Sequence, residues 1–149
     1  MEDPQRLNVY AAEDAVRDTT GPRLRRWAHV EPFFEQVIGS PHYIERFPDA
    51  PLEIGLGRRS HNARSSVAVV AHRQILIRDG SWNALTVLHE LAHLVAPGPP
   101  PHGPSFVATE LELVRLFCGF VDHAALARSF AEHGVTASHG PLAPPARCD

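Results

Sequence analysis

Hydrophobic residues recur at helical spacing over residues 82–96, and polar residues interrupt them at only a few positions. The apolar positions that carry this pattern are Leu85, Leu88, Leu91, Ala92, Leu94 and Val95. Because they cover more than one side of a helix, the pattern predicts a helix that is buried almost all round. Ser81 or Asp79 can cap its N-terminus, and Pro97 ends it.

Four other segments are predicted to be helical: residues 11–18, 23–40, 104–119 and 123–133. Pro104 suits the first turn of the third of these helices, and Asp122 can cap the fourth. We expect residues 6–10 to form a short first strand. Residues 41–51, which have proline at both ends, are expected to form a loop.

A small sheet is predicted in the middle of the chain, from strands at residues 52–59, 65–72 and 74–79. The β-branched residues Val67, Val69, Ile75 and Ile77 support this interpretation. The short link between the last two strands favours a hairpin. We therefore expect an α+β fold with a small, mostly antiparallel sheet packed against helices.

Length and composition are typical of one globular domain, which we place at residues 1–136 with a flexible tail at 137–149. The two cysteines, Cys118 and Cys148, form no CxxC pair, which argues against a cysteine zinc ribbon and fits a reducing compartment. The polar N-terminus and the absence of a long apolar run favour a cytoplasmic protein with no membrane partner.

Charge gives little reason to expect a nucleic-acid partner. Residues 23–26 (RLRR) and Arg58, Arg59 and Arg64 form two basic clusters. The formal net charge is nevertheless −3, so we interpret both clusters as solvated faces.

Two histidines and a glutamate interrupt the apolar helix, in the sequence LHELAHLV of residues 88–95. His89 and His93 stand one turn apart on the same face, so both imidazoles can bind one zinc ion. Burying these groups without a partner would cost several kcal/mol, and a metal supplies that partner. Zinc lowers the pKa of a bound water from about 16 to about 7, and Glu90 can take the proton.

A catalytic zinc needs a third protein ligand and an open position. His102 is the best candidate, since it follows His93 after a proline-rich turn that can fold back over the metal. Gly103 permits a close approach of the backbone, and Phe106 can anchor the next helix in the core. Glu110 is a weaker candidate ligand that we expect to support the site or to lie at the surface.

The sequence contains a cysteine in an apolar segment and several side chains that could stabilise a transition state. Cys118 lies among apolar residues and is expected in the core rather than as a nucleophile. A group that stabilises the transition state should lie near the zinc. Arg64, Tyr43 and His61 are candidates, and the sequence does not distinguish among them.

The motifs HELAH (89–93) and HGPSF (102–106) resemble the SprT-like class of zincin metallopeptidases, in which HExxH is followed by HGxxF or HGxxW. The resemblance covers residues 81–119. The whole chain is also similar to a family of small uncharacterised metallohydrolases from actinobacteria and their phages. The resemblance implies a zincin-like fold, zinc on His89, His93 and His102, and catalysis by Glu90.

The chain departs from related patterns in two ways. SprT-like proteins often carry a DNA-binding extension or a cysteine zinc ribbon, and this sequence has neither, so we do not expect it to cut proteins from DNA. Its third histidine also lies nine residues after His93, whereas metzincins place it about six residues after the second histidine.

Together these features predict a metallohydrolase with one zinc per chain that cleaves peptide bonds in a peptide or protein substrate. One alternative is a zinc hydrolase of a non-peptide amide or another small molecule. A second alternative is a zinc-binding module without catalysis. The sequence predicts neither the substrate nor the oligomeric state.

Overall fold

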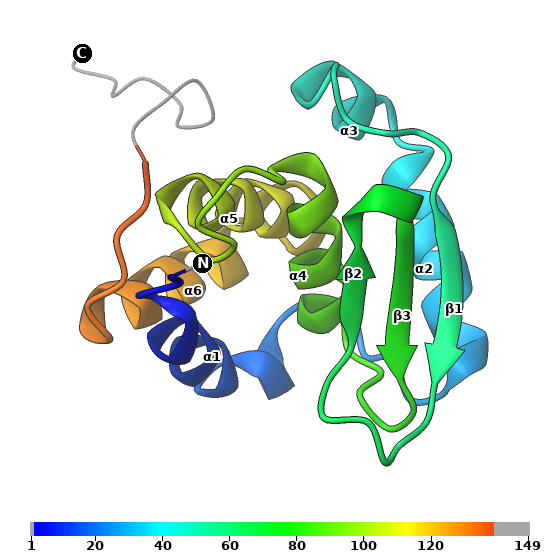
Figure 1. Cartoon of the computed structure of the whole chain (residues 1–149), viewed down its shortest axis with the longest axis horizontal. Coiled ribbons are helices and arrows are strands. Elements are labelled where there is room, and N and C mark those ends of the chain that lie inside the picture. Colours follow the sequence, from blue (N-terminus) through cyan, green and yellow to red (C-terminus); the bar gives the residue numbers. More distant parts are fainter. Residues whose placement is uncertain (1, 139–149) are drawn as a thin grey trace.

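Six α-helices and a three-stranded sheet make up residues 2–138, the part of the chain that the computed structural model describes (Figure 1). The elements are α1 (Arg6–Asp14), α2 (Trp27–Ile38), α3 (Pro41–Arg46), β1 (Gly55–Arg59), β2 (Val67–Val69), β3 (Gln74–Arg78), α4 (Ala84–Val95), α5 (Pro104–Cys118) and α6 (Phe120–Glu132). Short 3₁₀ turns lie at Arg17–Thr19 and Val70–His72. The fold is α+β, as predicted. Residues 139–149 of the predicted tail lie outside the described residues.

Strand β3 lies in the middle of the sheet, between β1 and β2. It forms the predicted antiparallel hairpin with β2 but runs parallel to β1, so the sheet is mixed and the prediction of a mostly antiparallel sheet was wrong. Ile75 and Ile77 of β3 are fully buried, which favours the position where both strand edges are paired. Residues 60–66 carry the chain from β1 past the end of β3 to β2 (Figure 1).

Helix α1 replaces the strand that was predicted at residues 6–10. Its buried side chains are Val9, Ala12 and Glu13, and their spacing of three and four residues is that of a helix. The helix packs against α6, which buries this face. The short apolar run in the sequence was therefore one face of a helix.

Other boundaries also differ from the prediction. The strand predicted at residues 65–72 is limited to Val67–Val69, and Val70–His72 form a 3₁₀ turn. Residues 41–46 form α3 where a loop was expected, because Pro41 occupies the first turn and the Ser40 hydroxyl accepts a hydrogen bond from the His42 N–H at 3.1 Å. Helix α6 begins at Phe120, so Asp122 does not cap it. The Asp122 carboxylate instead accepts a hydrogen bond from the Gly21 N–H at 2.8 Å.

Helix α4 runs through the middle of the molecule, between the sheet and α5 (Figure 1). Residues 84–92 are all buried, which confirms the prediction from the apolar pattern. The cap is Asn83 rather than Ser81 or Asp79, because its side-chain oxygen accepts a hydrogen bond from the Thr86 N–H at 2.7 Å.

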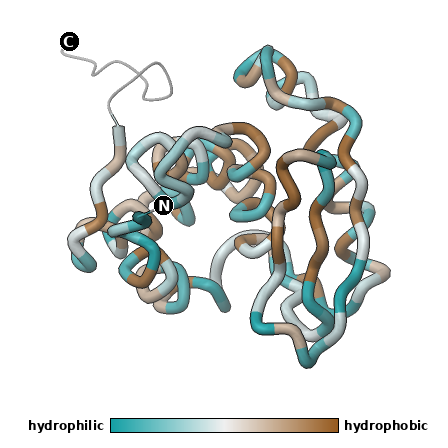
Figure 2. The backbone as a smooth tube through the Cα atoms, viewed as in Figure 1, coloured by the Kyte–Doolittle hydropathy of each residue, from teal (hydrophilic) through white to brown (hydrophobic). Residues whose placement is uncertain are grey.

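Apolar residues follow β2 and β3, whereas the loop between β1 and β2 is polar (Figure 2). The buried apolar residues form one cluster that includes side chains of α1, α2, α4, α5, α6 and β3. Among residues 2–138, no helix has both the length and the apolar character needed to cross a membrane.

Candidate metal centre

Three histidine side chains converge between α4 and the loop that precedes α5. Helix α4 presents His89 and His93 one turn apart, and His102 lies just before the first turn of α5. One ring nitrogen of each histidine lies within 4.8 Å of those of the other two. The Nε2 atoms of His89 and His102 are 3.3 Å apart. These three residues could hold a metal ion.

Phe106 provides an apolar wall for this cluster. The centre of its ring lies 4.9 Å, 4.5 Å and 5.0 Å from the ring centres of His89, His93 and His102. Its side chain is 1% exposed, which confirms that it anchors α5 in the core. An apolar wall reduces solvent screening, so it strengthens the attraction between a cation and its ligands.

Asp3 fixes the orientation of His102. The Asp3 Oδ2 atom lies 2.7 Å from His102 Nδ1, and Oδ1 accepts a hydrogen bond from the His102 backbone N–H at 3.0 Å. With its hydrogen on Nδ1, His102 directs the lone pair of Nε2 toward His89. A carboxylate commonly holds a metal-binding histidine in this way.

Glu13 fixes the orientation of the His89 ring in a similar way, because its Oε2 atom lies 2.5 Å from His89 Nδ1. Glu110 Oε2 lies 3.4 Å from the same nitrogen. Glu13, His89 and Glu110 thus form a second group that could hold a metal, although it would use the nitrogen of His89 that faces away from His102. Burial and the nearby charge of Glu13 raise the pKa of Glu110 well above its usual value.

The protonation states suit a cation among the three histidines. Burial, together with the charges of His89 and His102, lowers the pKa of His93 to about 3. Burial also lowers the pKa of His102, although Asp3 acts in the opposite direction. Burial opposes the charge of His89 as well, but Glu13 raises the pKa of His89 well above its usual value. Two imidazoles with a lowered pKa therefore face a third imidazole, His89, whose proton a metal ion can displace on binding.

Glu90 follows His89 on α4 and is 7% exposed. Burial raises its pKa, and the positive charge of His89 and a backbone hydrogen bond from Ala68 act in the opposite direction. A carboxylate whose pKa is raised toward neutrality is a better general base.

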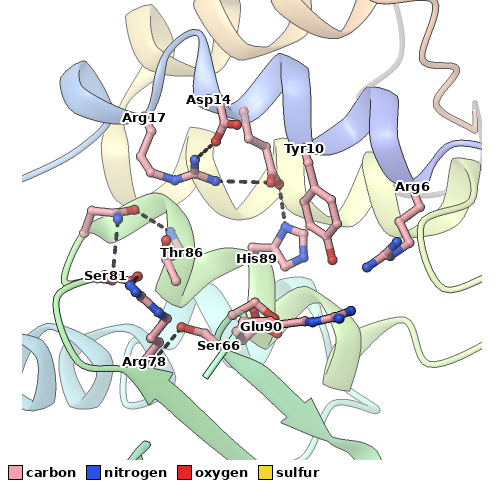
Figure 3. Close-up of a pocket in the computed structure, with 14 residues that line it drawn as sticks. Arg6, Tyr10, Asp14, Arg17, Ser66, Arg78, Ser81, Thr86, His89 and Glu90 are labelled. Carbon is pink, nitrogen blue, oxygen red and sulfur yellow. Dashed lines mark hydrogen bonds and ion pairs between the residues drawn. The ribbon is translucent and has the colours of Figure 1, made fainter. Parts of the chain in front are cut away.

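Two hollows open on either side of Glu90. One, of about 370 Å³, extends past His89 toward Arg17 and Arg78 (Figure 3). The other, of about 410 Å³, is lined by His93 and His102. Residues that line both are Arg6, Tyr10, Ser65, Ser66 and Glu90. The three histidines and Glu90 are therefore accessible from a groove between α1 and the β2 side of the sheet.

The three candidates for transition-state stabilisation lie in different places. Tyr43 is fully buried and donates a hydrogen bond to the Pro51 carbonyl at 2.9 Å, and His61 is exposed, so neither lines these hollows. Arg64 lines the first hollow. Cys118 is half-buried against the core, and burial raises the pKa of its thiol to about 12, as befits a residue that is not a nucleophile.

Sequence reasoning missed Asp3, Glu13 and Tyr10. The Tyr10 ring lies 5.7 Å from His89 and 5.1 Å from His102, centre to centre, which places it beside the site. The available signal was the helical spacing of Arg6, Tyr10, Glu13 and Arg17, which the interpretation of residues 6–10 as a strand obscured.

Comparison with protein-family models, with curated proteins and with solved structures finds no match to this chain. The fold and the site alone therefore define the class of protein. It is an α+β protein with a group of three histidines, two buried and one half-buried, that could bind a metal.

Proposed function

We propose that this protein is a zinc-dependent hydrolase that cleaves peptide bonds. The observation that carries the proposal is the convergence of His89, His93 and His102 beside Glu90, at the meeting point of two hollows. Within residues 2–138 the group contains no fourth histidine, cysteine or carboxylate ligand. A structural zinc takes four protein ligands, so three ligands and an open side favour catalysis over a purely structural role.

The chain supplies the groups that such a hydrolysis needs. His89, His93 and His102 would hold zinc, which when bound supplies a Lewis acid that acidifies water and polarises a carbonyl. Glu90 accepts a proton from the attacking water and gives it to the leaving amine. Tyr10 lines the same groove, and it is better placed than Tyr43 or His61 to donate a hydrogen bond to a developing oxyanion.

The edge of β2 offers a place for an extended substrate. β2 is an edge strand, since β3 pairs with only one of its sides. Val67 and Ala68 of this strand line the hollow that also contains Glu90, His93 and His102. A peptide added to β2 as a further strand would therefore pass the three histidines.

The test compares zinc-loaded wild type with the Glu90→Gln variant on unfolded casein and on a mixture of synthetic peptides. We expect cleavage by the wild type and a loss of about 10²-fold or more in the variant, because the proton acceptor is removed and the zinc ligands are kept. Glu53→Gln changes an exposed glutamate and is the matched control. Equal activity in wild type and Glu90→Gln, or no cleavage by zinc-loaded wild type, would contradict the proposal.

A further inference from the structure

Four arginines line the hollow that extends from Glu90 and His89 toward β3 (Figure 3). They are Arg6, Arg17, Arg64 and Arg78, and the hydroxyls of Ser65, Ser66, Ser81 and Thr86 lie on the same walls. We call this hollow the arginine pocket. Its side chains are rich in hydrogen-bond donors, which suits an anionic group.

Most of this positive charge has no carboxylate partner within the described residues. Arg17 pairs with Asp14 and Glu13. Arg78 donates to neutral groups, the Ala63 carbonyl at 2.8 Å and the Ser81 hydroxyl at 3.3 Å.

Arg6 lies over the Tyr10 ring, with its guanidinium carbon 5.4 Å from the ring centre. Arg64 is exposed, and neither it nor Arg6 forms an ion pair with a carboxylate of residues 2–138. Three guanidinium groups therefore face the pocket with charge that a ligand can neutralise.

The acidic residues of the pocket do not compensate for these arginines. The Glu13 carboxylate contacts His89 and pairs with Arg17, and the Asp14 carboxylate also pairs with Arg17. Glu90 is the proposed general base, and it lines both this hollow and the one that contains His93 and His102. The pocket therefore keeps guanidinium groups that an anion can bind.

We propose that the arginine pocket is a subsite for a carboxylate of the substrate, and that the enzyme selects peptides with an acidic residue close to the cleaved bond. This inference rests on the proposed peptidase function. Ser65 and Ser66 directly precede β2, so a peptide aligned on that strand would run past Glu90 into the pocket. Arg64 and Arg78 are the specificity-determining residues.

Two measurements test the inference. In the first, zinc-loaded wild type cleaves a library of peptides, each made as the free acid and as the C-terminal amide, and mass spectrometry locates the cleaved bonds. We expect about tenfold enrichment of Asp and Glu at one fixed position, in both forms of the library, because a charged hydrogen bond contributes about 1.5 kcal/mol or more.

The double variant Arg64→Gln/Arg78→Gln should lose this enrichment and still cleave neutral peptides. Arg64→Lys should keep most of it. Arg128→Gln, which changes an exposed arginine of α6 outside both hollows, should keep all of it. Enrichment confined to free-acid peptides would overturn the proposal in favour of recognition of the C-terminal carboxylate.

Cleavage without acidic preference, or a preference that survives in the double variant, would overturn the subsite while leaving the peptidase proposal intact. Absence of any cleavage would remove the peptidase proposal and this inference with it.

The second measurement does not depend on activity. The metal-free protein is titrated with N-acetylglutamic acid α-amide and, separately, with N-acetylglutamine amide, and the backbone amides are followed by NMR. Saturable shifts around residues 64–66 and 78–81 are expected with the acid alone and not in the double variant. Equal shifts with both compounds, no shift with the acid, or tighter binding of inorganic phosphate would contradict a carboxylate subsite.

Discussion

At the scale of single residues, two carboxylates decide which nitrogen of His89 and which nitrogen of His102 faces the centre of the site. Glu13 and Asp3 engage the Nδ1 atoms of His89 and His102, and this leaves the Nε2 atoms of both rings 3.3 Å apart. These two of the three proposed ligands are thus oriented before any metal binds. Removing either carboxylate should therefore lower the affinity for a metal more than it lowers the free energy of unfolding.

Asp3→Asn should therefore weaken zinc binding by about 10- to 100-fold, because the neutral amide holds the His102 ring less well. The asparagine oxygen can still accept the backbone N–H of His102, so the fold should be kept. Competition with a chromophoric chelator measures the affinity. Asp14→Asn, which changes an exposed carboxylate of the same helix region, is the control. Equal zinc affinity in wild type and Asp3→Asn would show that Asp3 does not position the ligand.

The sequence predicted the three histidines as a group but not the carboxylates behind them. HExxH places His89 and His93 by the geometry of one helical turn, and HGPSF places His102 shortly afterwards. Glu13 and Asp3 lie 76 and 99 residues away from their histidine partners in sequence. Without the tertiary fold, no local pattern brings such residues together.

At the scale of elements, helix α4 carries two of the three histidines and Glu90, so its start must be well defined. The Asn83 side chain accepts a hydrogen bond from the Thr86 N–H at 2.7 Å. This cap satisfies one of the N–H groups that the first turn leaves without a partner.

Asn83→Ala should lower the free energy of unfolding by about 1 kcal/mol. Asn83→Asp keeps a side-chain acceptor, so it should lower the free energy of unfolding by only about 0.3 kcal/mol. Urea denaturation of the metal-free protein measures both variants. Identical loss in both would mean that the side-chain acceptor does not stabilise α4.

Periodicity predicted α4 and α5 well, because long apolar stripes and proline boundaries define both helices. It failed for residues 6–10 and for the sheet. A five-residue apolar run fits a strand or one helical face equally well. The position of β1 beside β3 depends on which strand is buried most deeply. Packing of the sheet against α4 decides this, rather than the turn between neighbouring strands.

At the scale of the whole molecule, Glu112 ties α3 to α5. Its carboxylate is 3% exposed and accepts hydrogen bonds from Arg46 of α3 and from Arg115, each at 2.5 Å. Burial alone would raise the pKa of Glu112, but the hydrogen bonds from Arg115 and Arg46 lower it below its usual value. A lowered pKa in the folded state means that the interaction stabilises the protein above the unfolded-state pKa and is lost as the pH falls through the folded-state pKa.

Glu112→Gln should therefore lower the free energy of unfolding at pH 7 by about 1–2 kcal/mol. The difference from wild type should begin to shrink as the pH falls below the unfolded-state pKa of about 4.3. It should vanish only below the lowered folded-state pKa, where the wild-type carboxyl is protonated in both states. Denaturant unfolding at several pH values measures this. Glu132→Gln, at an exposed ion pair on α6, is the control and should change little. A difference that stays constant from pH 7 to pH 3 would contradict the assignment.

The central claim is that His89, His93 and His102 together bind one zinc ion. Elemental analysis of zinc-loaded, gel-filtered protein tests it most directly, on wild type, His89→Ala, His93→Ala and His102→Ala, with the exposed His72→Ala as control. We predict about one zinc per chain in wild type and in His72→Ala, and loss or sharp weakening in the other three. No zinc in the wild type, or full retention in any of His89→Ala, His93→Ala and His102→Ala, would contradict the account.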